Sequence, residues 1–284
     1  MLVLSETEWQ ERAAEHGRRA DALVRAHVER RKHGRPHPVE DFLFTYYQLR
    51  PAQLRRWHPG AGVILAGESA RERLDWRWYV ETADGVAVDA DAFRAARAEG
   101  IEYIRAVLEG TLERPGQFGC FGLHEWAMVY RQDPEQIRHH AVPLRLGSAG
   151  TDRVVESHRI RCSHFDAFRF FTDAAAPRNE VQPSRAAAPA LEQPGCLHAG
   201  MDCYRWAMKL GPLVPGELLL ACFELARDIR SLDMRASPYD LSGWGYRPVR
   251  IETAEGKAEY VAAQRGFAGR AEPLRRSLLE ILSA

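Results

Sequence analysis

Apolar positions recur at helical spacing over most of the chain, so the sequence predicts a mainly α-helical fold. The stretch 5–32 opens with Ser5 followed three positions later by Glu8, which is the pattern of a capping box, and continues as one polar helix. Helices are also expected at residues 89–112, 123–131, 152–171, 198–210, 217–235 and 256–282. Gly100 is the weak point of the first of these.

Short apolar runs between glycine-rich turns predict one β element, a small hairpin within residues 62–88 with strands at 63–65 and 75–81. Segments 172–194 and 237–252 are rich in proline or glycine and are expected to be irregular loops. The segment 39–47 is too aromatic for a surface helix and should be buried or line a pocket. Together these elements predict a single mainly helical domain.

The expected domain covers residues 1–284, with an N-terminal helix at 5–32, the hairpin region at 62–88 and a helical core at 89–284. A chain of 284 residues that is 45% hydrophobic can bury a full core. Its longest apolar run, 218–223, is far shorter than the ~20 residues that cross a bilayer, and the N-terminus becomes charged at Glu6. We therefore expect neither membrane insertion nor secretion.

The number of cysteines and the net charge further limit the class of protein that the sequence can encode. Five cysteines are an odd number, and neither a CxxC pair nor a Cys/His zinc spacing occurs in the sequence. This favours a reduced, cytoplasmic protein without a zinc finger. The 39 basic and 39 acidic side chains balance, which argues against a non-specific polyanion binder.

The first candidate for chemistry is a polar pair within an aromatic stretch. At helical spacing, His164 shares an apolar stripe with Ile160 and Phe168, while Asp166 lies on the neighbouring stripe. A histidine and a carboxylate would then flank a row of phenylalanines. The alternative is a core histidine bonded to a backbone carbonyl.

The second candidate pair is His198 and Asp202, which are four residues apart and so share one helical face. This spacing suits two metal ligands or a catalytic histidine with its orienting carboxylate. A structural His–Asp hydrogen bond explains it equally well. No HExxH or ExxH pair supports the metal reading elsewhere.

The third candidate region holds carboxylates near residue 230 and in the loop that follows. Asp228 and Asp233 share stripes with apolar residues, so both are expected to face the interior, either paired with nearby arginines or facing a ligand. Asp240 follows in a loop that also carries Tyr239, Trp244 and Tyr246. That loop is expected to form a pocket wall; alternatively, Asp240 caps the turn through Ser242.

A resemblance to a known family runs through nearly the full chain. It is carried by EDFLFTYYQLRPAQLRRWHPG (40–60), FGCFGLHEWAMVY (118–130), VVESHRIRCSHFDAFRFFT (154–172), LEQPGCLHAGMDCYRWAMKL (191–210) and LDMRASPYDLSGWGY (232–246). These segments resemble a group of actinobacterial-type proteins commonly labelled 3-methyladenine DNA glycosylase. The resemblance implies an N-glycosidic hydrolase.

Such a hydrolase would act on an alkylated or modified purine in DNA or in a free nucleoside or nucleotide. It needs aromatic surfaces for the base and a carboxylate for the cationic transition state, but neither a cofactor nor a metal. The catalytic candidates are Asp166, Asp233, Asp240 and His164. The substrate-binding candidates are His198, Asp202, Trp126, Tyr130, Trp206, Tyr239 and Trp244.

Two other functions stay open. The first is a helical, iron-type metal-dependent oxidoreductase with the ligands His124, Glu156, His164, His198 and Asp202. The second is a non-enzymatic domain that binds a ligand or partner and uses its polar network only as architecture. In each enzymatic case, we expect the polar candidates of the helical core to converge on one pocket, namely His164, Asp166, His198, Asp202 and Asp233.

Overall fold

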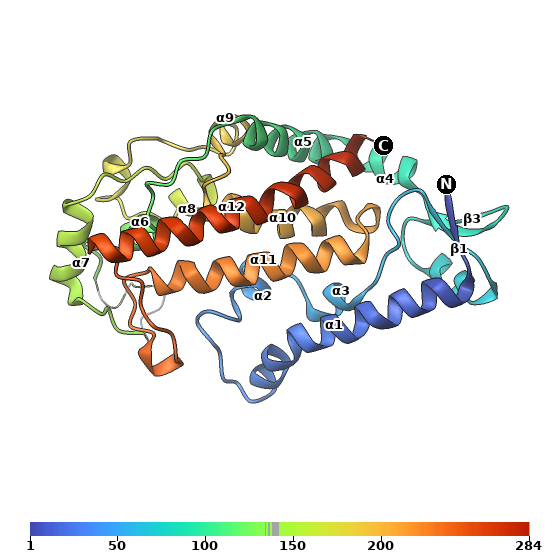
Figure 1. The fold of residues 1–284 in the computed structure, drawn as a ribbon, viewed down its shortest axis with the longest axis horizontal. Coiled ribbons are helices and arrows are strands. Elements are labelled where there is room, and N and C mark those ends of the chain that lie inside the picture. The colour runs from blue at the N-terminus through green and yellow to red at the C-terminus, as the bar shows by residue number, and fades with distance from the viewer. Residues whose placement is uncertain (134, 136, 138–141, 284) are drawn as a thin grey trace. The chain divides into compact units, whose positions relative to one another are not determined.

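A computed structural model describes residues 1–133, 135, 137 and 142–283, and it confirms a mostly helical protein (Figure 1). The chain divides into two compact units. The first comprises Met1–Arg105, Cys203–Glu224 and Leu274–Ala284, and the second comprises Ala106–Asp202 and Leu225–Pro273. Because compact units can be parts of one domain, the single domain stays a prediction.

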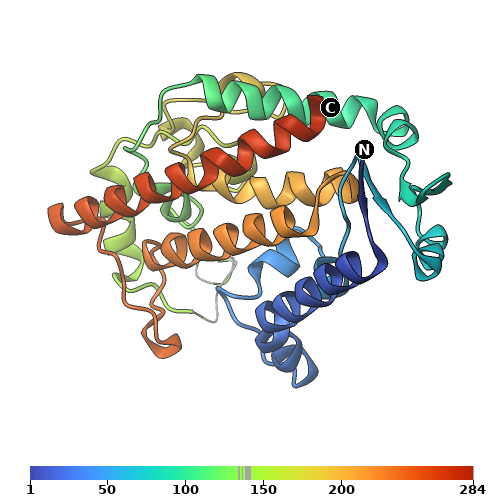
Figure 2. The same ribbon diagram turned by 45° about the vertical axis from the view of Figure 1, so that its right-hand side comes forward.

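The first unit begins with the predicted N-terminal helix. Helix α1 (Glu6–Lys32) has the capping box expected from sequence: Glu8 donates its backbone N–H to Ser5 Oγ and accepts from the Ser5 backbone N–H. The short helix α3 (Pro51–Arg55) lies against α1 in both views (Figures 1 and 2).

The short helix α2 (Phe42–Tyr46) lies within the aromatic segment 39–47. Its residues Leu43 and Phe44 are buried, and a cavity of about 530 Å³ is lined in part by Phe44 and Thr45. Both outcomes expected for this segment therefore occur.

The β element is larger than expected. Strands β1 (Leu2–Leu4), β2 (Val63–Leu65), β4 (Gly85–Val88) and β3 (Tyr79–Thr82) form one sheet in that order, with β1 parallel to β2 and the other pairs antiparallel. A hairpin does lie within 62–88, but its strands are β3 and β4, whereas the expected partners at 63–65 and 75–81 do not pair with each other. The expectation that the β structure is confined to 62–88 is also wrong. Three residues of β1 are too few to show a period in the sequence.

The expected strand 75–81 is also corrected. A 3₁₀ helix, η1 (Glu68–Asp75), runs to Asp75, and Trp78 has a φ of 73°, which interrupts an extended chain. The alternation of tryptophans in this segment is the pattern of a strand, which is why the sequence predicted one. The backbone, however, is not extended over the whole segment.

Several helices match their predicted bounds to within a few residues. These are α10 (Leu197–Leu210), α11 (Gly216–Arg235) and α12 (Ala254–Ser283), each of which contributes residues to both units. The expected helix 89–112 is instead two helices, α4 (Ala90–Ala96) and α5 (Ala98–Glu113), which break at Arg97 rather than at Gly100. A 3₁₀ turn, η4 (Gly211–Leu213), follows α10.

The expected helix 152–171 is wrong over its middle part. Helix α7 (Gly147–Glu156) ends early, and α8 (Phe165–Phe168) is short. Between them, the Asn179 side chain accepts the Cys162 backbone N–H and donates to the Cys162 carbonyl, so this backbone is bonded outside a helix. Helix α6 (Leu123–Ala127) is likewise shorter than the expected 123–131.

The two predicted loops contain only short helical turns. These are η3 (Ala176–Arg178) and α9 (Ala188–Leu191) in the first loop and η5 (Ser242–Trp244) in the second. Within the second unit, ion pairs Arg235–Glu259 at 2.9 Å and Asp228–Arg270 at 2.8 Å join α11 to α12, which run antiparallel (Figures 1 and 2). Among the helices described, none combines the length and apolarity that a membrane span needs.

One buried histidine of the first unit makes its stability dependent on pH. His58 Nδ1 lies 2.8 Å from the Tyr79 hydroxyl, and its ring stacks on Tyr79. Burial, followed by the positive charges of Arg73, Arg56 and a protonated His16, lowers the pKa of His58 from 6.5 to about 3. The folded protein therefore holds this imidazole neutral.

We expect acidification to destabilise the fold through His58. Because its pKa is lower in the folded than in the unfolded state, its contribution is present above pH 6.5 and is lost as the pH falls toward 3. Between about pH 7.5 and pH 5.5, urea unfolding should show a loss of about 1 kcal/mol that is absent in His58→Gln. An equal loss in the two proteins would remove His58 as the cause, and His33→Gln, at an exposed position, is the control.

Candidate functional site

The second unit buries a group of ionisable side chains that we call the buried polar cluster. Its members are His124 and Glu125 of α6, His164 at the N-cap of α8, Glu192 at the C-cap of α9, His198 and Asp202 of α10, and Arg230 and Asp233 of α11. Each of them is at most 8% exposed. Buried ionisable groups are costly unless they are paired, so their contacts decide what the cluster can do.

Asp233 is the centre of one half of the cluster and is fully buried. His124 Nε2 donates to Asp233 Oδ1 over 2.8 Å, and Arg230 donates to Asp233 Oδ2 over 2.9 Å. The same guanidinium donates to Glu125 Oε1 over 2.8 Å. Both oxygens of Asp233 are thereby bonded to positively charged partners.

The electrostatics of this pair follow from its burial. Burial disfavours the charged form of His124, but the charge and hydrogen bond of Asp233 outweigh it and raise the histidine's pKa well above its usual value. Burial also opposes ionisation of Asp233, yet His124 and Arg230 keep the pKa of that carboxyl below its usual value. The two therefore form an ion pair at neutral pH.

His164 is the centre of the other half. Its Nδ1 lies 2.6 Å from Glu192 Oε1, and its Nε2 lies 3.8 Å from Asp202 Oδ2. Burial disfavours its charged form, but Glu192 and then Asp202 outweigh burial and raise the pKa of His164 to about 9.

The contact between His164 and Glu192 is close without being a good hydrogen bond. Although the two atoms are within ion-pair distance, His164 Nδ1 has no partner that meets hydrogen-bond geometry among the described residues. The second oxygen of Glu192, Oε2, also lacks such a partner within the described part of the chain. Buried polar atoms without partners are rare and need an explanation.

His198 lies between the two halves. Its ring stacks on that of His164 with centroids 5.1 Å apart and meets the ring of His124 edge-on at 4.6 Å. Burial, and then the positive charge of His124, lowers the pKa of His198 well below its usual value. Its imidazole is therefore neutral, which is the form that binds metals.

Three groups of side chains in the described residues are close enough to hold a metal ion, since the ligand atoms of each group lie within 4.8 Å of one another. The groups are His124, His198 and Asp233; His164, Glu192 and Cys196; and His164, Asp166 and Asp202. The first has the two histidines and one carboxylate of non-haem iron(II) sites. The second adds a sulfur ligand, which is typical of zinc and iron sites.

The five polar residues that we expected to converge lie in close groups, whereas their lining of one pocket stays a prediction. His164, Asp166, His198, Asp202 and Asp233 all belong to the three ligand groups. The stated reason is wrong for His164, because residues 157–164 are not helical and no helical stripe places it. Asp228 is also corrected: it is only half-buried and pairs with Arg270 rather than facing the interior.

Two other candidates lie apart from the cluster. Glu156, a proposed metal ligand, is 40% exposed and accepts hydrogen bonds from Tyr130 and Arg131. Asp240 is exposed and accepts the backbone N–H of Ser242 over 3.0 Å, which is the turn-capping alternative.

The five aromatic residues proposed to bind a base differ in their exposure and in the unit to which they belong. Trp126, Tyr130 and Tyr239 are at most 3% exposed, and the Trp126 indole N–H donates to the carbonyl of Ala236 over 2.9 Å. Trp206 belongs to the first unit, and Trp244 is 44% exposed. Four of the five are therefore buried, whereas stacking a base requires an open aromatic face.

Sequence reasoning missed Glu125, Glu192 and Cys196. Glu192 lies in a segment expected to be an irregular loop, where no periodic pattern indicates which way a side chain points. The loop is held because Gln193 accepts the backbone N–H groups of Gln117 at 2.7 Å and Gly195 at 2.8 Å. Glu125 adjoins His124, and its buried carboxylate is bonded by Arg230 of α11, a partner that the local sequence does not indicate.

Comparison of the chain with protein-family models, with curated proteins and with solved structures found no match. The functional argument therefore depends on the geometry of the buried polar cluster.

We expect Asp233→Ala to destabilise the protein strongly. Removing this carboxylate leaves His124 and Arg230 buried without their shared counter-charge, which typically costs about 3–5 kcal/mol. Urea unfolding at neutral pH measures the loss. Asp240→Ala, which removes an exposed carboxylate, should change the unfolding free energy little, and equal effects of the two substitutions would contradict the prediction.

Proposed function

We propose that the buried polar cluster is a metal centre and that the protein is a metal-dependent oxidoreductase. The observation that supports this proposal best is the group His124, His198 and Asp233, whose ligand atoms lie within 4.8 Å of one another in a buried setting. A metal bound here would replace the proton that His124 Nε2 donates to Asp233 Oδ1, so binding would release a proton. Two histidines and one carboxylate leave open coordination positions on iron(II), where oxygen and a substrate bind.

The remaining members of the cluster also suit a metal centre. A carboxylate oxygen and an imidazole nitrogen 2.6 Å apart without hydrogen-bond geometry, as in Glu192 and His164, are arranged like two donors that face one cation. The unpartnered Glu192 Oε2 adds a further donor. A cation here would satisfy buried atoms that the described protein groups leave unsatisfied.

Neighbouring residues would orient these ligands. Arg230 holds Asp233 Oδ2 while it also bonds Glu125, so the carboxylate has one fixed orientation. His124 presents its Nδ1 toward Cys120 Sγ at 3.8 Å. A bound iron would supply one-electron chemistry with oxygen, and the buried surroundings would shield reactive species from water.

The N-glycosidic hydrolase is the second candidate. It is supported by the family resemblance and by Asp233, a carboxylate kept ionised by His124 as a cationic transition state requires. Its weakness is access, since Asp233 is fully buried with both oxygens bonded. Base release from alkylated DNA or a modified nucleoside by metal-free protein would favour the hydrolase.

Elemental analysis of the purified protein tests the proposal. We expect about one or two iron or manganese ions per chain, because the cluster offers two ligand groups without a shared member. His198→Ala should lose most of the metal. His16→Ala is the matched control, because His16 is a buried histidine of the first unit that contacts the Leu54 carbonyl at 2.8 Å.

The outcomes separate the candidates. Equal metal content in wild type and His198→Ala, with both folded by circular dichroism, would contradict ligation by this cluster. Zinc as the bound metal would support a metal centre but contradict the oxidoreductase. Protein that stays metal-free after anaerobic loading with iron(II), and whose cluster variants lose only stability, would indicate an architectural network.

A further inference from the structure

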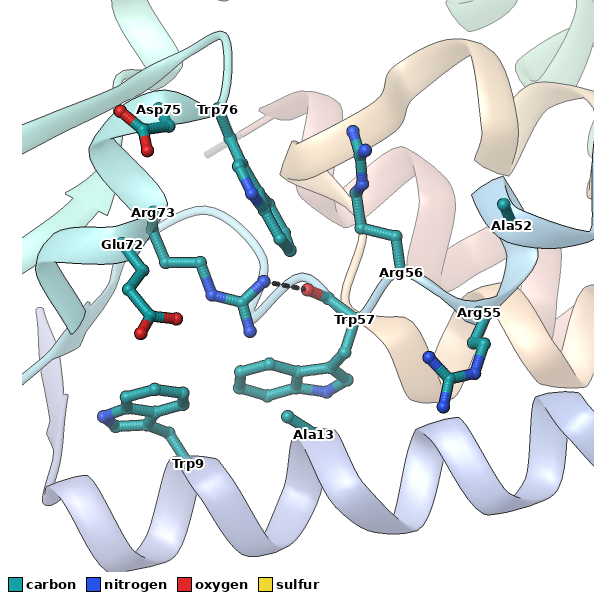
Figure 3. Close-up of a pocket in the computed structure, with 10 residues that line it drawn as sticks. All are labelled: Trp9, Ala13, Ala52, Arg55, Arg56, Trp57, Glu72, Arg73, Asp75 and Trp76. Carbon is teal, nitrogen blue, oxygen red and sulfur yellow. Dashed lines mark hydrogen bonds between the residues drawn. The ribbon is translucent and has the colours of Figure 1, made fainter. Parts of the chain in front are cut away.

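The first unit contains a cavity of about 620 Å³ with an unusual lining, shown in Figure 3. Three tryptophans and three arginines line it together with two acidic residues and two alanines: Trp9, Trp57, Trp76, Arg55, Arg56, Arg73, Glu72, Asp75, Ala13 and Ala52. Its volume lies within the range of small-molecule sites, which is about 300–1,000 Å³.

Two of the indoles are fixed in place. Trp9 is 6% exposed and donates its indole N–H to the Ala66 carbonyl over 2.9 Å. Trp57 is 3% exposed and donates to Glu217 Oε1 over 3.2 Å. Because both polar ends are bonded, these rings are rigid walls rather than mobile side chains.

Arg73 brings a half-buried positive charge to this cavity. Its guanidinium lies 3.8 Å from the centroid of the Trp76 ring and 5.6 Å from that of Trp9, and it donates to the Trp57 carbonyl over 3.4 Å. Within the described residues, it forms no ion pair at 4.0 Å or less. The rings, one carbonyl and the nearby charge of Glu72 offset the burial of this guanidinium without a bonded carboxylate, so an anion that enters the cavity would stabilise it further.

Arg56 adds a second cation. Its guanidinium lies 4.7 Å from the Trp76 centroid, and Figure 3 shows Arg56 and Arg73 on either side of that indole. Arg56 is exposed and likewise has no ion-pair partner among the residues described. Arg55 differs, because Asp21 pairs with it at 2.9 Å.

We propose that this cavity binds a nucleoside monophosphate. Trp76 is the half-buried indole of the three, and among the residues described one of its faces is covered only by the exposed Arg56. If Arg56 turns to a bound phosphate, whose oxygens match guanidinium geometry, that face becomes open to a nucleobase. The exposed carboxylates of Glu72 and Asp75 at the cavity favour hydroxyl and amino groups of a nucleoside over a longer polyanion, which they would repel. The proposal is independent of the metal centre, whose ligands all belong to the second unit.

Tryptophan fluorescence titration of the full chain with AMP tests this proposal, with adenosine and ribose 5-phosphate as separate arms. If stacking and phosphate contacts both contribute, AMP binds at least about tenfold tighter than either fragment. Equal binding of adenosine and AMP would overturn the role of the arginines. Equal binding of ribose 5-phosphate and AMP would overturn stacking, and no binding of AMP at millimolar concentration would overturn the proposal as a whole.

Substitutions locate the site. Arg56→Gln and Arg73→Gln should each weaken AMP binding by about tenfold, the loss of one charged hydrogen bond. Arg77→Gln is the matched control, because Arg77 stacks on Trp78 at 4.4 Å but neither residue lines the cavity. Arg56 is exposed, so its variant should keep the wild-type melting temperature. Equal weakening by all three substitutions, or none by Arg56→Gln and Arg73→Gln, would contradict the assignment.

Discussion

The ion pair between His124 and Asp233 is the constraint on which the second unit is organised. A carboxylate with no solvent contact is tolerated only where cations replace its hydration, and His124 and Arg230 do so from two different helices. The pairing of His124 with Asp233 therefore holds α6 against α11. Glu125 also bonds Arg230, so the two positive and two negative groups of this half are paired with one another and depend on one another.

The other half of the cluster is not satisfied in the same way. His164, Glu192 and Asp202 bring two carboxylates to one imidazole, and the closest contact lacks hydrogen-bond geometry. A network built for stability alone would pair its atoms fully, since each unpaired buried group costs free energy. This difference between the halves supports the proposed metal centre over a purely architectural network.

The two units accommodate half-buried or buried arginines by different means. In the second unit, Arg230 bonds two carboxylates, and its charge is used within the protein. In the first unit, Arg73 is placed over indole faces, which attract a cation without neutralising it. A neutralised charge stabilises the fold, whereas one held by rings remains available to an anion that enters the cavity.

The sequence by itself determined the mostly helical class and the long helices α1, α10, α11 and α12, because periodicity and caps are local signals. It also identified His164, His198, Asp202 and Asp233 as polar residues with apolar neighbours. Only the tertiary structure decided their partners. Glu192 reaches His164 through a loop with no periodic signal, and β1 pairs with a strand some sixty residues away in the chain. Such contacts depend on long-range packing, which local propensity does not encode.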